Sequence, residues 1–149
     1  MAERARRRGR ATAAAAAEAS PVMQGGMARA LGVRLISLTR KKVIAEMAVR
    51  PMHFNRSGRV SGGAIMAFAD VLDAAGAVHN LPHGHRSGTI ESKSNFFVAG
   101  KGPALRAVSI PLHIGRTTSV WQTTIKNPDG HIVAIVTQTQ IVIPAKSGS

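Results

Sequence analysis

Residues 60–70 read VSGGAIMAFAD, and this stretch opens the one long helical pattern of the chain. Ser61 is a good N-cap, because its side-chain oxygen can accept a hydrogen bond from an amide of the first helical turn. Apolar or small residues recur after it at three- and four-residue spacing, among them Ile65, Phe68 and Leu72. This spacing predicts a helix over 61–80 with a broad apolar face. Asp70 is a carboxylate among apolar neighbours and calls for a specific role.

Alternation with a period of two surrounds this helix and predicts strands. Pro111 in one of them indicates an edge or a bulge. NPDG at 127–130 is a tight-turn sequence that predicts a hairpin. We expect a strand pair, the long helix and then four strands in a meander, which is an α+β fold with an antiparallel sheet wrapped around one central helix. The predicted strands are 33–39, 43–49, 89–98, 104–114, 118–127 and 131–143.

Composition excludes several kinds of site. The 149 residues contain no cysteine, which rules out disulfides, thiolate catalysis and Cys-based zinc sites. No apolar run approaches the roughly 18–20 residues of a membrane span. The net charge of +13 favours anionic partners, but aromatic residues are only 3% of the chain, so we expect phosphorylated small molecules and no nucleic acid. His79, His83 and His85 lie in or beside a Gly/Pro loop without a carboxylate partner, and we expect no metal.

The N-terminus is a separate compositional segment. Residues 1–20 are rich in Arg and Ala and are expected to form a disordered or loosely helical basic tail, followed by a single domain over 21–149. Residues 21–32 predict a short helix after a proline. An Arg-rich, acid-poor start is also typical of organelle transit peptides, so the purpose of the tail stays open. It lacks the apolar core of a secretory signal, and we expect a cytoplasmic protein.

Gly62 and Asp70 are separated in a way that matters for chemistry. The first amides of a helix have no intrahelical partner, and glycine there lets a ligand oxygen approach them. Asp70 follows eight residues later, roughly 12 Å along the axis, too far to act on a group bound at the same helix start. Two antiparallel helices from two copies could bring these groups together. Alternatively, Asp70 lies on the solvent-facing side of an amphipathic helix, and the glycines only permit close packing. We expect Asp73 to be structural or solvent-facing.

The motif HFN-x-x-G-x-x-SGGAIMAFAD at 53–70, followed by TIESKSNFF at 89–97, a Gly-Arg pair and an Asp-Gly hairpin, carries a family resemblance. It resembles the hot-dog-fold acyl-CoA thioesterases of the phenylacetate-pathway type over roughly residues 30–143. The resemblance implies a hot-dog fold, hydrolysis of acyl-CoA to a free acid and coenzyme A without a cofactor, and a homodimer or homotetramer.

The resemblance also implies roles for individual residues. It makes Asp70 the general base or nucleophile, the Gly62 backbone N–H the oxyanion donor, Asn55 a positioner of substrate or water, and Thr89 the holder of the hydrolytic water. Basic residues that could meet coenzyme A phosphates are Arg116, Lys93 and Arg59, although each could be an ordinary solvated charge.

Ser61 and Gly63 flank the implied oxyanion site, and Ser61 is a departure, since the family commonly has His at this position. Ser61 still caps the helix but supplies no imidazole. A non-catalytic acyl-CoA-binding module with reduced turnover is therefore the alternative function. A hydratase on the same fold would pair its carboxylate with a histidine, and neither His53 nor His79 fits that role well.

Overall fold

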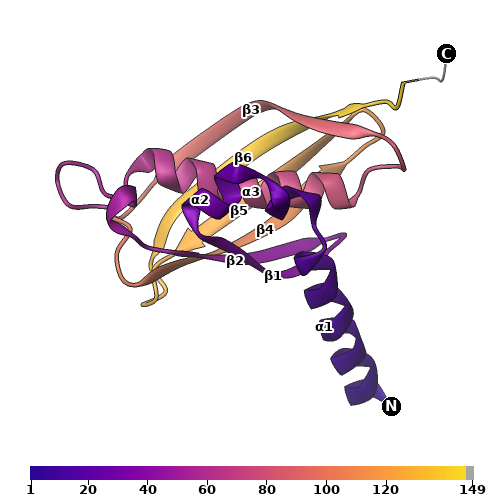
Figure 1. Ribbon diagram of the computed structural model, residues 1–149, viewed down its shortest axis with the longest axis horizontal. Coiled ribbons are helices and arrows are strands. Elements are labelled where there is room, and N and C mark those ends of the chain that lie inside the picture. The colour runs from indigo at the N-terminus through magenta and orange to yellow at the C-terminus, as the bar shows by residue number, and fades with distance from the viewer. Residues whose placement is uncertain (147–149) are drawn as a thin grey trace.

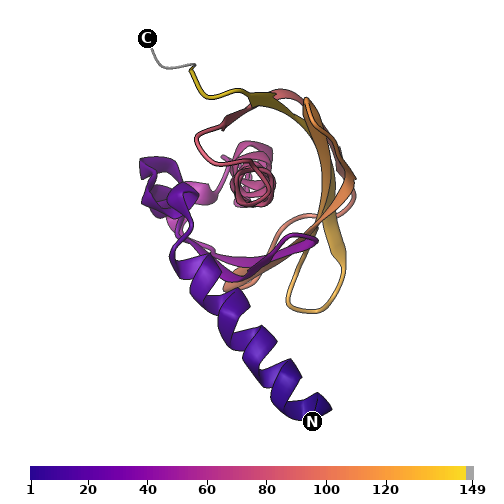
Figure 2. The ribbon, with the colours of Figure 1, turned by 90° about the vertical axis from the view of Figure 1, so that its right-hand side faces the viewer.

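The computed structural model describes residues 1–146 and contains one long helix inside a curved antiparallel sheet. Figure 2 looks nearly along helix α3 (Gly62–His79) and shows the sheet curling around it. This is the predicted α+β architecture, a hot-dog fold, and the prediction is confirmed. The sheet order is β1-β2-β4-β5-β6-β3, with strands β1 (Val33–Thr39), β2 (Lys42–Ala48), β3 (Arg86–Phe96), β4 (Ala104–Ile114), β5 (Thr118–Lys126) and β6 (Ile132–Ile143).

Helix α3 begins and packs as its sequence predicts. The Ser61 hydroxyl accepts a hydrogen bond from the Ala64 amide at 3.2 Å, which confirms the N-cap. Phe68 and Leu72 are fully buried between the helix and the concave face of the sheet. Gly76 permits a close approach of the helix to the sheet, since a Cβ there would lie 2.6 Å from the ring of Trp121 on β5. A small residue at this turn is therefore what lets the helix lie against the sheet.

The order of the strands corrects one expectation. β4, β5 and β6 form a meander, but β3 pairs with β6, and β4 pairs with β2, so the predicted four-strand meander is wrong. The reason is that α3 carries the chain across the concave face before β3 begins. β3 therefore forms the far edge of the sheet, and β4 returns to the strand pair (Figure 1). Local alternation shows where strands lie but carries no information on which of them pair.

The hairpin predicted at 127–130 is confirmed, and another hairpin joins the predicted strand pair. Thr39 pairs with Lys42 across the first hairpin. In the last hairpin the Asn127 amide donates to the His131 carbonyl at 3.0 Å, and Gly130 has a φ of 88°, a conformation that favours glycine. The β4–β5 register shifts just after Pro111, which is the predicted bulge.

The N-terminal segment is helical and touches the domain. Helix α1 (Ala2–Glu18) packs its last turns on β1, where Ala13 and Ala17 are buried, while its arginines are exposed. A 3₁₀ turn (Pro21–Gln24) and helix α2 (Gly26–Leu31) replace the single short helix predicted over 21–32. The rest of α1 projects from the domain (Figures 1 and 2). Within residues 1–146, no helix combines the length and the apolar character that crossing a membrane requires.

Candidate active site

Asp70 lies on the side of α3 that faces β3 and β6. Its Oδ1 accepts two hydrogen bonds, one from Thr89 Oγ1 on β3 and one from Gln138 Nε2 on β6, each at 3.1 Å. The side chain is only half-buried, because β3 is the last strand of the sheet. The structure therefore brings together two residues predicted for the site, Asp70 and Thr89, and adds a third, Gln138.

Two buried glutamines extend this contact into a chain of hydrogen bonds. Gln138 Nε2 also donates to Ser92 Oγ at 3.1 Å, and Gln140 Nε2 donates to Thr89 Oγ1 at 2.9 Å and to Gln138 Oε1 at 3.0 Å. Ser87 Oγ donates to Gln140 Oε1 at 3.3 Å. Sequence reasoning missed both glutamines. The available signal was the alternation in VTQTQ, which places Gln138 and Gln140 on the same face of β6 as the buried Val136.

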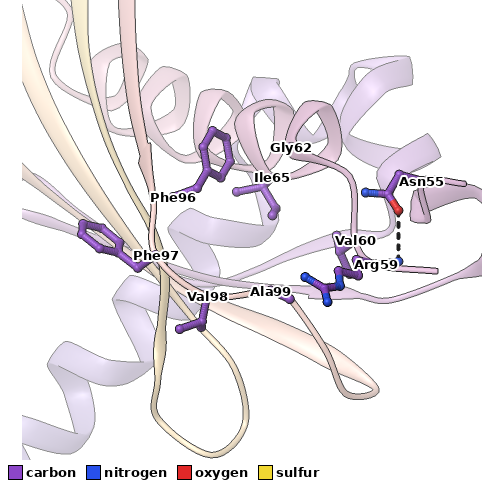
Figure 3. A pocket seen from close by; sticks show the side chains of 10 residues that line it. Asn55, Arg59, Val60, Gly62, Ile65, Phe96, Phe97, Val98 and Ala99 are labelled. Carbon is purple, nitrogen blue, oxygen red and sulfur yellow. Dashed lines mark hydrogen bonds between the residues drawn. The ribbon is translucent and has the colours of Figure 1, made fainter. Parts of the chain in front are cut away.

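A second feature, an open cleft of about 290 Å³, lies at the start of α3. Gly62 and Ile65 form its helix side, and the end of β3 with the segment after it forms the other side (Figure 3). The Phe96 ring lies over the helix start, since a Cβ on Gly62 would be 3.3 Å from it. The lining residues are Asn55, Arg59, Val60, Gly62, Ile65 and the stretch 96–100.

Asn55 shapes the loop that enters α3. Its side-chain Oδ1 accepts hydrogen bonds from the backbone amides of Ser57 at 2.9 Å and Arg59 at 3.2 Å. The backbone N–H of Asn55 donates to the Arg59 carbonyl at 2.8 Å. The Asn55 side chain also lines the cleft beside Gly62 (Figure 3). Asn55 thus lies beside Gly62 and fixes the loop through its oxygen.

The two groups of residues do not meet in one chain. The cleft at Gly62 is lined by neither Asp70 nor Thr89. This agrees with the roughly 12 Å along the helix axis that eight residues impose.

The remaining predicted binding residues are dispersed. Ser61 is used as the helix cap, and Gly63 beside it is exposed. Arg116 lies in the β4–β5 turn, next to Thr117, whose carbonyl accepts from the Val142 amide near the start of β3. Arg116 is therefore at the opposite end of the sheet from Gly62 in the same chain. Lys93 follows Ser92 on β3 and so points to the convex face, away from Asp70.

Asp73 is buried, and the expectation that it could face solvent is wrong. Its Oδ1 accepts hydrogen bonds from Ser109 Oγ and Thr123 Oγ1, both at 2.6 Å, which ties α3 to β4 and β5. Within the described residues Oδ2 has no partner. Burial raises the pKa of Asp73 to about 7, the two hydroxyls oppose this rise, and the charge of Asp70 adds to it. Asp73 is thus structural, which was one of the two alternatives expected from the sequence.

No histidine of the described residues donates a hydrogen bond to Asp70, whose two donors are a threonine and a glutamine. His53 is buried, and its Nδ1 accepts from the Arg50 amide at 3.1 Å. Burial and then the charge of Arg50 lower the pKa of His53, which favours a neutral ring. His79 is exposed at the end of α3. No three metal-ligating side chains gather anywhere in residues 1–146.

Comparison with known proteins places this geometry in a family context. The thioesterase superfamily profile matches residues 57–134. The chain is 29% identical over 122 residues to "Putative esterase ComA2" of Bacillus subtilis strain 168, covering 81% of this chain and 97% of that protein. It is 20% identical over 110 residues to the 1,4-dihydroxy-2-naphthoyl-CoA hydrolase of Listeria monocytogenes, covering 74% of this chain and 89% of the hydrolase.

A solved structure shares the fold. A mutant of thioesterase PA1618 from Pseudomonas aeruginosa superposes with a TM-score of 0.78 at 24% identity, covering 82% of this chain and 88% of that one.

Proposed function

Because this chain belongs to the thioesterase superfamily, we propose that it hydrolyses acyl-CoA thioesters to a free acid and coenzyme A. Asp70 is the general base or nucleophile of this reaction, and the Gly62 amide is the oxyanion donor. The observation that carries the proposal is the Asp70 carboxylate held by Thr89 and Gln138 beside the open edge of the sheet. A half-buried carboxylate with a hydroxyl partner suits the activation of water or direct attack.

The chemistry follows from the free oxygen of Asp70. As a general base, Oδ2 takes a proton from a water held at Thr89 while the water oxygen attacks the thioester carbonyl. The Gly62 N–H, one of the unpaired first amides of α3, stabilises the oxyanion. Collapse of this intermediate breaks the C–S bond, and the thiolate of coenzyme A takes the proton from Asp70. As a nucleophile, Asp70 would instead attack the thioester carbonyl and expel coenzyme A as its thiolate, which leaves the acyl group on Asp70 as an anhydride. Water then hydrolyses the anhydride to the free acid and the Asp70 carboxylate, and a proton from this water goes to the thiolate.

A second copy of the chain completes the site in this proposal. β3 pairs only with β6 in the described part of the chain, so one side of this strand of 11 residues is free to accept another strand. Antiparallel pairing with the β3 of a second copy places the two α3 helices side by side and antiparallel. It also sets the start of one β3, near Thr89, opposite the end of the other, where the Gly62 cleft lies. A homodimer, alone or within a tetramer, then contains two shared sites.

The same arrangement supports the acyl-CoA class of substrate. Arg116 lies at the Asp70 end of its own chain, and in the dimer this end is the one nearest the cleft of the second copy. The apolar side chains of Ile65, Phe96 and Val98 line that cleft and suit an acyl chain. One similar protein is named as a CoA-thioester hydrolase. The alternative of a non-catalytic binding module rests on Ser61 and is opposed by the contact between Asp70 and Thr89.

The proposal is tested with a panel of acyl-CoA esters and a thiol-release assay. Asp70→Asn keeps the shape and the hydrogen-bond acceptor Oδ1 but cannot act as a base, and the rate should fall by at least ~100-fold. Asp129→Asn, in the exposed last hairpin, is the matched control. Near wild-type turnover by Asp70→Asn would exclude the mechanism, and no hydrolysis by the wild type of any ester would favour the binding module.

Subunit sharing needs its own experiment. Gly62→Pro removes the amide hydrogen at the first helical position, where proline is tolerated, and Ser61 already has the extended conformation that precedes proline. Gly62→Ala keeps the hydrogen and is the control. When inactive Gly62→Pro and Asp70→Asn chains are refolded together in equal amounts, mixed dimers hold one intact site. We expect roughly a quarter of the wild-type activity to return. No recovery despite subunit exchange, or a monomer by light scattering at micromolar concentration, would refute the shared site.

A further inference from the structure

Gln138 and Gln140 are long polar side chains buried in the concave face of the sheet, with exposed fractions of 2% and 1%. Burying a primary amide is costly unless its donors and acceptor are paired. Here both hydrogens of each amide and both amide oxygens have a partner. One of these hydrogen bonds joins the two side chains, from Gln140 Nε2 to Gln138 Oε1. This saturated arrangement ends at Asp70 and Thr89, the two residues on which the proposed hydrolysis depends.

The direction of every hydrogen bond in the chain follows from the carboxylate. An ionised Asp70 only accepts, so Gln138 must turn its Nε2 toward it and its Oε1 toward Gln140. Gln140 must then present Nε2 to that oxygen, and its second hydrogen goes to Thr89 Oγ1. Because Thr89 Oγ1 already accepts from Gln140, its own hydrogen is free to go to Asp70 Oδ1. No amide in this chain can be reversed without facing an oxygen toward another oxygen.

This order has consequences for the two reacting groups. Oδ1 of Asp70 is occupied by two donors, and the hydrogen bonds of the described residues reach Oδ1 alone, so Oδ2 is the oxygen available for chemistry. Thr89 Oγ1 keeps one lone pair and no free hydrogen. It can therefore accept a hydrogen bond from a water but cannot donate one to it, which leaves the lone pairs of that water free for attack.

We propose that Gln138 and Gln140 are positioning residues that orient Asp70 and the Thr89 hydroxyl through this one-directional chain. The inference rests on the proposed thioesterase function. Neither glutamine touches the substrate. Gln138 fixes which carboxylate oxygen is occupied, and Gln140 fixes the direction of the Thr89 hydrogen bond.

The decisive variant is Gln138→Glu, which has nearly the same shape but places an acid against Asp70. Two adjacent carboxylates cannot both ionise easily, so the acidic limb of the pH profile of kcat/KM should move to higher pH by at least ~1 unit. At pH 7, kcat should fall at least ~10-fold with KM changed by less than ~2-fold, since binding contacts are intact. Gln122→Glu is the matched control, because Gln122 bonds Thr137 Oγ1 on the neighbouring strand and lies on the other face of the sheet.

A purely structural role would lower stability without moving the pH profile, and a Gln138→Glu profile superimposed on that of the wild type overturns the proposal. If Gln138→Glu does not fold, Gln140→Met replaces it. This variant removes the donor to Thr89 and should lower kcat several-fold with KM unchanged, and an unchanged kcat overturns the proposal in that case. Asp70→Asn is run alongside. Loss of activity in Asp70→Asn with wild-type behaviour in the glutamine variants refutes this inference alone, whereas an active Asp70→Asn refutes the proposed function.

Discussion

Asp73 makes stability depend on pH in a direction opposite to that of most carboxylates. Burial raises its pKa from 3.8 to about 7. Between these values the folded chain binds a proton that the unfolded chain has released. The free energy of unfolding must therefore decrease as the pH rises through this interval and level off above about pH 7. The decrease ends where the native carboxyl is fully ionised.

The size of this effect follows from the difference between the two pKa values. One pKa unit corresponds to about 1.4 kcal/mol, so the full interval amounts to about 4 kcal/mol, and the part between pH 5 and pH 8 to about 3 kcal/mol. Such a loss is a large fraction of the stability of an ordinary domain. Asp129 changes stability with pH in the opposite direction and in a more acidic range. The hydrogen bonds of His131 and Lys101 lower its pKa to about 2, so its contribution changes only below pH 4.

The assay is urea unfolding of the wild type and of Asp73→Asn at pH 5 and pH 8, at one protein concentration because assembly shifts apparent stability. The neutral amide keeps an oxygen for Ser109 and Thr123 but cannot ionise. From pH 5 to pH 8, the free energy of unfolding of the variant should rise by about 3 kcal/mol relative to that of the wild type. Asp129→Asn is the control and should follow the wild type. Parallel pH dependence of the wild type and Asp73→Asn would refute the reasoning.

Two further predictions concern packing. Gly76→Ala places a methyl 2.6 Å from the Trp121 ring and should destabilise the domain by about 1–3 kcal/mol, with a changed near-ultraviolet circular dichroism of the single tryptophan. An unchanged melting temperature and spectrum would contradict this contact. Ala17→Glu puts a charge in the contact between α1 and β1 and should detach and loosen α1, so that trypsin cleaves at its exposed arginines faster than in the wild type, whereas Ala14→Glu, on the exposed side of α1, should leave the cleavage rate unchanged. Equal cleavage in both variants would show that α1 is not held by this contact.

The elements of the fold were predictable because they are local. The cap at Ser61, the helical spacing of α3 and the turn at 127–130 depend on residues a few positions apart. The strand order was not, because the pairing of β3 with β6 depends on the path of the chain across the sheet. The burial of Asp73 was missed for a similar reason. Its partners Ser109 and Thr123 lie 36 and 50 residues away and are not recognisable until β4 and β5 are placed over α3.

The candidate site divides in the same way. Asp70 and Gly62 stood out because a charge in an apolar helix and glycines at a helix start are unusual locally. Gln138 and Gln140 looked like ordinary polar residues of a strand, since alternation alone does not say which face of β6 meets the helix. Only the burial of Val136 on the same face, known from the fold, shows that these amides point inward. A polar pair on the buried face of a strand is a signal that becomes readable only after the faces are assigned.

The position of β3 links assembly to catalysis in the proposed dimer. Thr89 and Ser92 lie on the last strand of the sheet and are exposed, so the hydrogen-bond chain that orders Asp70 reaches solvent at this edge. Pairing of two β3 strands would cover this chain and at the same time bring the Gly62 cleft of the second copy to Asp70. Loss of the dimer would then remove the oxyanion donor, which is the Gly62 amide of the second copy. It would also leave Asp70 exposed to solvent. On dilution well below the dimer dissociation constant, the turnover per chain should therefore fall toward zero rather than level off at half, and the total rate should follow the square of the protein concentration in that range.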